Sequence, residues 1–386
     1  MRTQPPVYSP MPARAVLAAI RAGPSACDKL ATLLARDYDA QRVLLTESGT
    51  QALQLAIEVA LAATGSRTVA LPAYCCYDVA TAAIGAGARI TFFDLDPATL
   101  APDQDSLRAA FRRGAAVAVV APLYGIPVPW PELESVARDH SALLIEDAAQ
   151  GHGASWSDRP LGSHGALAVL SFGRGKGWTA GAGGALLGRG DGAALVANTT
   201  VRAGRRARAH TGRCLAQSWL ARPRLYALPR ALPWLGLGQT IYREPTPPSA
   251  MSAAAAALAL ATRDPAECEA AARRERAARL LSALPRHLHA IVYGRDSQPG
   301  YLRLPILAPR ATANRLVATL GHAGVAAGYP RPLPALPQVQ SAVSPGPAAW
   351  PGAAGLVDRL VTLPVHSLLR QEEVGALLQQ VAGLSG

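Results

Sequence analysis

The chain has 386 residues, of which 50% are hydrophobic and 17% are charged, with 35 glycines and 32 prolines. This composition excludes a disordered protein, because disorder requires low hydrophobicity and a high fraction of charge, and the length predicts two domains. The formal net charge is +12, and all but two of the 38 basic residues are arginine, the exceptions being Lys29 and Lys176.

From residue 42 onward the sequence alternates between helical and strand-like periodicity. Helices are predicted over residues 48–63, after Pro72, and over 103–113 and 131–140. Strands are predicted over residues 68–71, 89–94, 116–121, 142–146, 169–172 and 184–188. This alternation predicts an α/β fold with a mainly parallel sheet covered by helices on both faces, in which ligands bind beyond the carboxyl ends of the strands.

The pattern changes in the second half of the chain. Residues 201–248 are rich in arginine, proline and tryptophan and show no clear periodicity. Helices are predicted again over residues 251–261 and 268–284, followed by a short strand over 301–306 and a closing helix from Gln371. We therefore predict an N-terminal arm over residues 1–40, a large domain over 41–250 and a smaller C-terminal α/β domain over 251–386.

The cysteines and the N-terminus bear on the cellular compartment. The five cysteines are odd in number and have no zinc-ligand spacing, so neither a disulfide framework nor a metal site is expected. Residues 1–23 lack the core of a signal peptide, and no apolar run is long enough to span a bilayer. We expect a reduced, cytoplasmic protein that is not an integral membrane protein.

Two motifs in the first half could bind a ligand at the end of a strand. Residues 46–50 (Thr-Glu-Ser-Gly-Thr) open the first long helix. Free backbone N–H groups there favour a phosphate, although Ser48 could also act only as a helix cap. Glu146 and Asp147 end a buried strand, where a carboxylate could hold a cationic ring nitrogen, bind a metal or cap the next turn.

The third motif is Lys176 among glycines, in residues 171–177 (Ser-Phe-Gly-Arg-Gly-Lys-Gly). Its spacing excludes a P-loop, which would need a glycine at Leu170 and a hydroxyl residue at Gly177. The glycines that follow, Gly181 and Gly183, do not form a dinucleotide fingerprint, because Leu186 stands where the third glycine would be. A lysine on an open loop after a strand suits a Schiff base instead, which arginine cannot form.

A phosphate cup, a strand-end aspartate and a loop lysine, in this order, are the parts of a pyridoxal-phosphate (PLP) site. Their order and intervals resemble the DegT/DnrJ/StrS family, the sugar-aminotransferase branch of fold type I. The matching segments are residues 48–50, 72–88, 94–96, 124–125, 146–154, 171–172, 176 and 183–184, with weaker matches at 273–284, 329–333 and 363–366. The resemblance implies a fold-type-I PLP-dependent transferase that forms a homodimer.

The resemblance also implies roles for the matched residues. Lys176 would form the Schiff base with PLP and then move the proton between substrate and cofactor, while Asp147 would keep the pyridine nitrogen protonated. The other implied cofactor-binding residues are Ser48, Gly49, Thr50 and Ser171 at the phosphate, Gln150 near the 3′-oxygen of the ring, and Tyr77 or Tyr74 against its face.

The implied reaction is amino transfer from an amino acid, most naturally glutamate, to a ketone on a nucleotide-linked sugar. Two alternatives stay open: a PLP enzyme of the same fold that acts on a non-sugar carbonyl, and a PLP-binding regulatory protein without turnover.

Three features depart from the family pattern, and one of them is Ala182, which stands where an acidic residue is common. Cys76 stands where the family often has an aromatic residue that stacks on the ring, so Tyr74 or Tyr77 would have to supply that face. Residues 247–250 (Pro-Pro-Ser-Ala) lack the asparagine that usually completes the phosphate site of the partner subunit, which puts this cross-subunit contact in question.

A basic segment with seven arginines lies between Arg202 and Arg224, interleaved with Trp219 and followed by Tyr226 and Trp234. It could form a dimer or site-rim surface, contact a substrate phosphate, or bind a membrane or nucleic acid. The aromatic residues follow no binding-platform pattern and prolines break any long amphipathic helix, so nucleic acid is not the expected partner.

Overall fold

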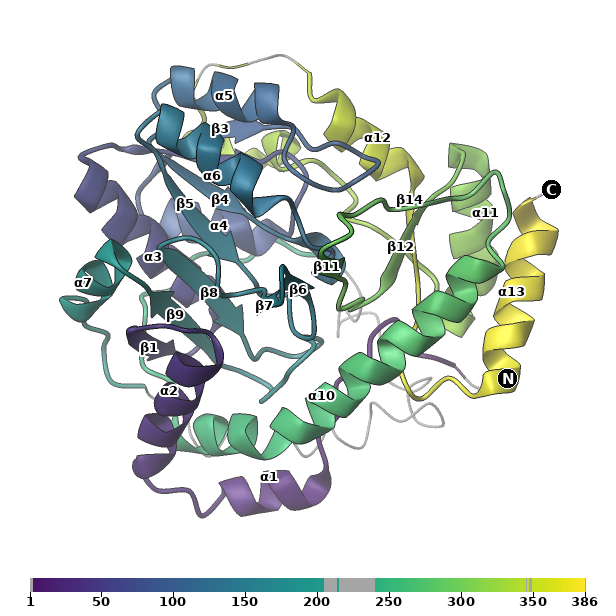
Figure 1. Ribbon diagram of the computed structural model, residues 1–386, viewed down its shortest axis with the longest axis horizontal. Helices are drawn as coiled ribbons and strands as arrows, with labels where there is room; N and C mark the ends of the chain where they lie inside the picture. Colours follow the sequence, from purple (N-terminus) through teal and green to yellow (C-terminus); the bar gives the residue numbers. More distant parts are fainter. Residues whose placement is uncertain (1–2, 205–213, 215–239, 345, 347–348, 386) are drawn as a thin grey trace.

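A seven-stranded, mainly parallel sheet lies at the centre of the first half of the chain (Figure 1). It is seen in a computed structural model that describes residues 3–204, 214, 240–344, 346 and 349–385. The strand order is β1-β9-β8-β5-β4-β2-β3, and β9 alone runs against both of its neighbours within this sheet. The strands are β1 (Arg42–Thr46), β2 (Thr68–Pro72), β3 (Arg89–Phe93), β4 (Val117–Val120), β5 (Leu143–Asp147), β8 (Leu167–Ser171) and β9 (Gly184–Gly188).

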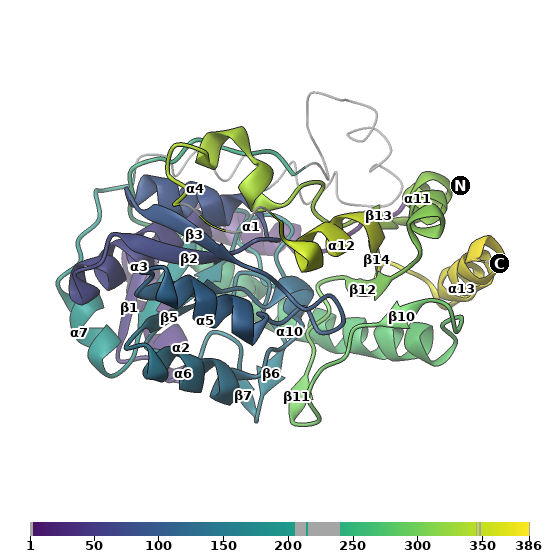
Figure 2. The same ribbon diagram turned by 90° about the horizontal axis from the view of Figure 1, so that it is seen from above.

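Helices cover both faces of this sheet, as the sequence predicts. Helices α3 (Gly49–Thr64) and α4 (Tyr77–Gly85) pack together on one face, and α5 (Gln104–Arg112) and α6 (Trp130–Asp139) pack on the other (Figure 2). The bounds of α3 follow from its sequence: Ser48 accepts a hydrogen bond from the N–H of Gln51, and Gly65 ends the helix in the left-handed region with φ 63°. Small and branched apolar residues fill the layers between, and all four residues of β4 are fully buried.

The N-terminal residues are helical, which the sequence pattern did not predict. Helix α2 (Ser25–Asp37) packs against β1 and against the long helix α10, and α1 (Ala13–Ala19) also packs against α10. Helix α7 (Asp191–Ala197) covers β9 and β1. A small sheet joins the two halves of the chain, because β11 (Ser297–Gln298) pairs with β6 (Ser155–Trp156), which also pairs with β7 (Arg159–Pro160).

Helix α10 (Ala253–Ser282) corrects the prediction of two separate helices over residues 251–261 and 268–284. It is continuous for 30 residues with Pro265 inside it. Proline removes one helical hydrogen bond and normally breaks a helix. Thr262 and Ala266 on either side are fully buried, so packing holds the helix together across the proline.

The second sheet is antiparallel and smaller, with the strand order β10-β12-β14-β13. Its strands are β10 (His289–Ala290), β12 (Leu304–Leu307), β13 (Ala326–Ala327) and β14 (Leu360–Leu363), accompanied by α11 (Arg310–Leu320), α12 (Pro351–Arg359) and α13 (Gln371–Ser385). Asp94, after β3, accepts hydrogen bonds from the backbone N–H groups of Gly352 (2.7 Å) and Ala353 (2.8 Å) and so caps α12. The predicted domain boundary near residue 250 stays a prediction.

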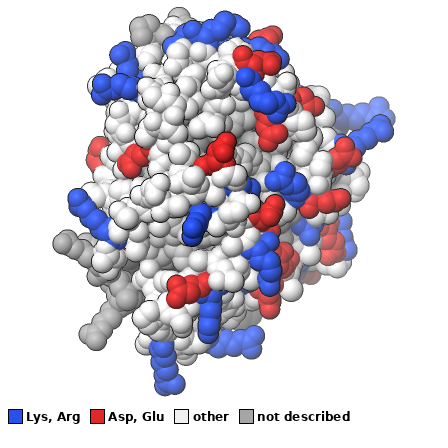
Figure 3. All heavy atoms as spheres, turned by 60° about the vertical axis from the view of Figure 1, so that its left-hand side comes forward, with Lys and Arg blue, Asp and Glu red and all other residues white. Residues whose placement is uncertain are grey.

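Charged side chains are interspersed on the face shown in Figure 3, where acidic residues lie among the arginines. Several described arginines pair with carboxylates, as Arg263 does with Asp37 at 2.6 Å. Apart from Arg202, the arginines of the basic segment lie outside the described residues, so its predicted roles stay predictions. Among the described residues, no helix has the length and apolar character needed to cross a bilayer, and no cluster of metal-binding side chains is found.

Candidate active site

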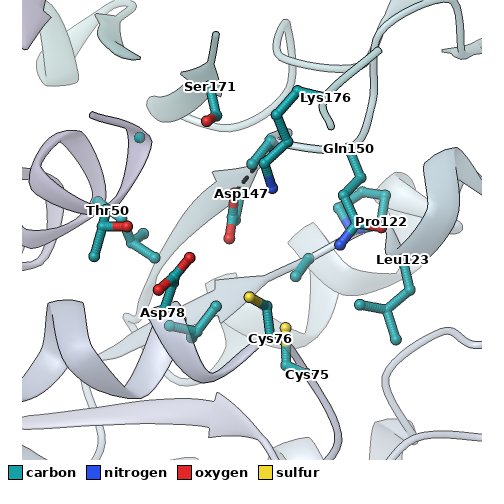
Figure 4. Close-up of a pocket in the computed structure, with 15 residues that line it drawn as sticks. Thr50, Cys75, Cys76, Asp78, Pro122, Leu123, Asp147, Gln150, Ser171 and Lys176 are labelled. Atoms are coloured by element: carbon teal, nitrogen blue, oxygen red, sulfur yellow. Dashed lines mark hydrogen bonds between the residues drawn. The ribbon is translucent and has the colours of Figure 1, made fainter. Parts of the chain in front are cut away.

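A pocket lies at the edge of the seven-stranded sheet where β1, β2, β4, β5 and β8 end (Figure 4). These strands are parallel, so the residues that follow their carboxyl ends converge on one place. Six of the eight predicted site residues line the pocket, namely Gly49, Thr50, Asp147, Gln150, Ser171 and Lys176. Ser48 lies directly beside it as the cap of α3, and Tyr77 is not among the lining residues.

The N-terminal turn of α3 forms one wall of the pocket. Gly49 lies so close to Ser171, the last residue of β8, that a Cβ atom at position 49 would be 2.6 Å from the Ser171 Cβ. Gly184 at the start of β9 is equally close, since a Cβ there would be 2.5 Å from the Gly49 nitrogen. Two glycines therefore let the helix end reach the sheet, where its dipole and the Thr50 and Ser171 hydroxyls favour an anion.

Asp147 ends β5 and faces into the pocket, and its Oδ1 accepts a hydrogen bond from the backbone N–H of Ala149 at 3.1 Å. Burial raises the pKa of Asp147, while the charge of Lys176 acts in the opposite direction. Glu146 points away from the pocket into the core, where it is fully buried and accepts a hydrogen bond from the His164 N–H at 2.8 Å. Burial raises the pKa of Glu146 to about 8. Of the two adjacent carboxylates, only Asp147 is therefore available to a ligand.

Lys176 extends from the loop after β8 toward Asp147 (Figure 4). Its backbone is held in place at both ends: the N–H donates to the Gly173 carbonyl at 3.3 Å, and the carbonyl accepts from the Ser9 hydroxyl at 2.6 Å. The N-terminal residues thus help to hold the lysine loop, a role that the sequence pattern did not indicate.

Gln150 follows β5 and is held by two partners. Its Oε1 accepts from the Tyr124 N–H at 2.8 Å, and its Nε2 donates to the Tyr329 hydroxyl at 2.7 Å. Tyr329 comes from the second half of the chain, so this contact spans 179 residues.

The opposite wall of the pocket contains residues that sequence reasoning did not single out. Cys75 and Asp78 line it together with Cys76. Burial raises the pKa of the Cys76 thiol to about 12, with the charge of Asp78 acting in the same direction, so Cys76 is a neutral thiol at pH 7. In the sequence, Asp78 is marked only by its place in the first turn of a helix that follows the end of a strand.

Tyr74 and Tyr77 are buried and do not line the pocket, so their predicted stacking on a ring stays a prediction. Cys76, in the place of the usual aromatic residue, does line it.

Residues 246–250, which lack the expected asparagine, pack against α3 of their own chain. Gln51 donates from its Nε2 to the Thr246 hydroxyl at 3.1 Å and to the Pro247 carbonyl at 3.3 Å. The Ser249 hydroxyl donates to Glu47 Oε2 at 2.7 Å. This segment therefore lies beside the α3 wall of the pocket.

Comparison with known proteins places these features in a family. A sequence model of the DegT/DnrJ/EryC1/StrS aminotransferase family matches residues 15–382. The chain is 36% identical over 140 residues to the L-glutamine:2-deoxy-scyllo-inosose aminotransferase of Streptomyces kanamyceticus, which covers 36% of this chain and 33% of that protein. It is 31% identical over 153 residues to the 3-amino-5-hydroxybenzoate synthase of Amycolatopsis mediterranei, covering 40% and 39%. The chain thus spans about a third to two-fifths of these two curated relatives.

Solved structures share the fold over nearly the whole chain. The PLP form of Spr1654 from Streptococcus pneumoniae superposes with a TM-score of 0.75 at 19% sequence identity, covering 100% of this chain and 98% of that one. The mainly parallel sheet, the helices on both its faces and this likeness confirm the predicted fold-type-I α/β architecture.

Proposed function

The chain belongs to the DegT/DnrJ/EryC1/StrS aminotransferase family, and from this premise we propose that it transfers an amino group from an amino acid to a ketone with PLP as cofactor. One observation carries the proposal: a lysine amine, a strand-end carboxylate and a helix N-terminus with two hydroxyl groups line the same pocket.

The residues of the pocket fit PLP in three ways. The contact between Gly49 and Ser171 leaves no room for a side chain at position 49 and brings the positive end of α3 next to the Ser171 hydroxyl, which suits a phosphate. Asp147 offers an acceptor for a protonated ring nitrogen. Lys176 offers the amine that attaches the cofactor.

When bound, PLP supplies an electron sink for the bond changes at the substrate carbon. Asp147 would keep the proton on the ring nitrogen, and this added cation would in turn favour the ionised form of the carboxylate. Once the substrate amine has taken its place, Lys176 would have a free amine that can accept the proton from the substrate carbon and donate it to the carbon on the other side of the shared nitrogen. The N-terminus of α3, with Thr50 and Ser171, would hold the phosphate and so orient the cofactor toward both side chains.

For the acceptor we propose a ring ketone that carries hydroxyl groups, such as a sugar or a cyclitol. The name of the Streptomyces kanamyceticus relative supports this class. In finer detail, we propose that the acceptor is linked to a nucleotide, that glutamate is the amino donor and that the protein forms a homodimer. The name of the Amycolatopsis mediterranei relative favours a second candidate, an amino transfer to a carbocyclic ketone without sugar character.

The test uses the two lysines of the chain as a matched pair. Lys176→Ala should remove the visible absorbance of the purified, PLP-supplemented protein, whereas Lys29→Ala, at an exposed position on α2, should keep it. Reduction with borohydride followed by peptide mapping should place the cofactor on Lys176 alone. A parent protein that binds no PLP would refute the proposal.

Amino donors then separate the remaining functions. Glutamate and glutamine are added in turn to the PLP protein, and loss of the visible band reports amino transfer to the cofactor. A panel of ketones (nucleotide-linked keto sugars, free inososes and carbocyclic ketones) is tested for return of the band. A coloured protein that no amino donor converts would instead be the PLP-binding regulatory protein without turnover.

A further inference from the structure

Tyr329 connects two walls of the pocket from the second half of the chain. It follows β13 and is buried. Its hydroxyl accepts a hydrogen bond from Gln150 Nε2 at 2.7 Å, on the segment after β5. Its backbone N–H donates to the Tyr74 hydroxyl at 2.8 Å, on the segment after β2 that continues into Cys75 and Cys76 of the pocket.

The orientation of the Gln150 amide follows from these partners. The Tyr124 backbone N–H, 2.8 Å away, can only donate, so the atom that faces it is the amide oxygen. The amide nitrogen is then on the other side and spends one of its two hydrogens on the Tyr329 hydroxyl. Figure 4 shows this nitrogen on the pocket side of Gln150. Its second hydrogen makes Gln150 a donor toward a bound ligand.

Tyr329 is itself held by its surroundings. Its ring makes an edge contact with Tyr74 at a centroid distance of 5.3 Å and stacks on Tyr124 at 6.2 Å, with 17° between the planes. The guanidinium of Arg303 lies 5.1 Å from the centroid of the Tyr124 ring. A side chain at Gly328 would collide with the Tyr74 hydroxyl, so the backbone before Tyr329 fits closely as well. Burial raises the pKa of Tyr329 well above its usual range, so its hydroxyl stays neutral.

We propose that Tyr329 positions Gln150, holding its amide so that an N–H donor points at the oxygen substituent of the bound cofactor ring. This inference rests on the proposed PLP function. Gln150 is the residue that touches the cofactor, and Tyr329 acts only through it. Because Tyr329 follows a strand of the second sheet, the C-terminal part of the chain helps to set a contact in the cofactor pocket.

A double-mutant cycle on cofactor affinity tests the proposal. Apo protein is titrated with PLP for the parent, Tyr329→Phe, Gln150→Ala and the double variant. Tyr329→Phe keeps the ring and loses one hydrogen-bond partner, so it should weaken PLP binding by about fivefold to tenfold. In the Gln150→Ala background the same change should have no further effect. Equal weakening in both backgrounds, or no weakening at all, would overturn the proposal.

The absorbance of the bound cofactor gives a second readout. It would stay unchanged if Tyr329 only stabilised the fold. A donor at the ring oxygen stabilises its anionic form, so loosening that donor should raise the pH midpoint of the visible band in Tyr329→Phe and in Gln150→Ala alike. Tyr293→Phe is the matched control. It removes the 3.0 Å hydrogen bond that the Tyr301 hydroxyl donates to the Tyr293 hydroxyl, and neither residue lines the pocket. It should leave the midpoint unchanged, and an unchanged midpoint in Tyr329→Phe would count against the proposal.

Gln150→Glu keeps the proposal testable should Tyr329→Phe fail to fold. A glutamate can accept from both the Tyr124 N–H and the Tyr329 hydroxyl, but it offers no donor to the ligand. Its PLP affinity should fall at least as far as that of Gln150→Ala, and parent-like affinity would contradict the proposed orientation. A parent protein that binds no PLP refutes the proposed function itself, whereas a PLP-binding parent with parent-like variants refutes only the role of Tyr329.

Discussion

Gly49→Ala should separate the α3 N-terminus from the sheet. The new methyl carbon would lie 2.6 Å from the Ser171 Cβ and 2.8 Å from its Oγ. That is about 1 Å inside the ~3.5–4.0 Å at which non-bonded carbon atoms make favourable contact. The Ser171 end of β8 is backbone-anchored through its pairing with β9, so the overlap has to move the helix end. Overpacking of this kind costs about 1–3 kcal/mol, and the free energy of unfolding of the apo protein should fall by that amount.

The same shift should weaken PLP binding, because the helix end is the proposed phosphate site. Loss of one hydrogen bond to a charged group costs about 1.5–3 kcal/mol, which is about tenfold or more in the dissociation constant. Urea unfolding of the apo protein and PLP titration measure the two effects separately.

Two further variants make this reasoning refutable. Gly375→Ala on α13 is the control, because a Cβ there meets nothing within 4 Å and the exchange should stabilise the helix by about 0.5–1 kcal/mol. Ser171→Gly in the Gly49→Ala background removes the colliding atoms and should restore part of the lost unfolding free energy. Gly49→Ala that unfolds like the parent, or a loss that Ser171→Gly does not relieve, would refute the contact as the cause.

Two other substitutions test stability. The pKa of Glu146 is raised to about 8 by burial from an ordinary value of 4.5, so the folded state holds a proton that the unfolded chain releases between these values. The stabilising contribution of this proton is complete below about pH 4.5 and is lost as the pH rises through about 8. Across this range the free energy of unfolding should therefore fall more steeply for the parent than for Glu146→Gln. Parallel curves for the two proteins would contradict the raised pKa of Glu146. Asp94→Ala should lower the unfolding free energy by about 1–3 kcal/mol, because the N–H groups of Gly352 and Ala353 lose their cap, and a parent-like urea midpoint would contradict this role.

Local signals in the sequence predicted the frame of the pocket. Ser48 and Gly65 mark the two ends of α3 through cap chemistry that involves only neighbouring residues. Asp147 and Lys176 could be placed because Asp147 ends a buried strand and Lys176 follows another, and the parallel sheet brings strand ends together. Their convergence in one pocket agrees with that reasoning, while their chemical roles stay proposals.

The features that sequence reasoning missed depend on contacts between distant residues. The partner of Gln150 lies 179 residues away, and no local pattern identifies Tyr329 as that partner. The predicted gap between the helices over residues 251–261 and 268–284 is absent, because α10 continues through Pro265 and the residues on either side of it are buried. Asp78 gave no signal beyond a common helix start, and its place in the pocket is set by how α4 packs after β2.

Helix α10 has a mechanical consequence for the whole molecule. Its 30 residues make a rod of about 45 Å at 1.5 Å per residue, packed against α1 and α2 near one end and against α13 near the other (Figure 1). Helix α10 therefore connects the N-terminal helices with the closing helix of the chain. Pro265 leaves one carbonyl of the helix without its usual partner, and bending costs least at such a point.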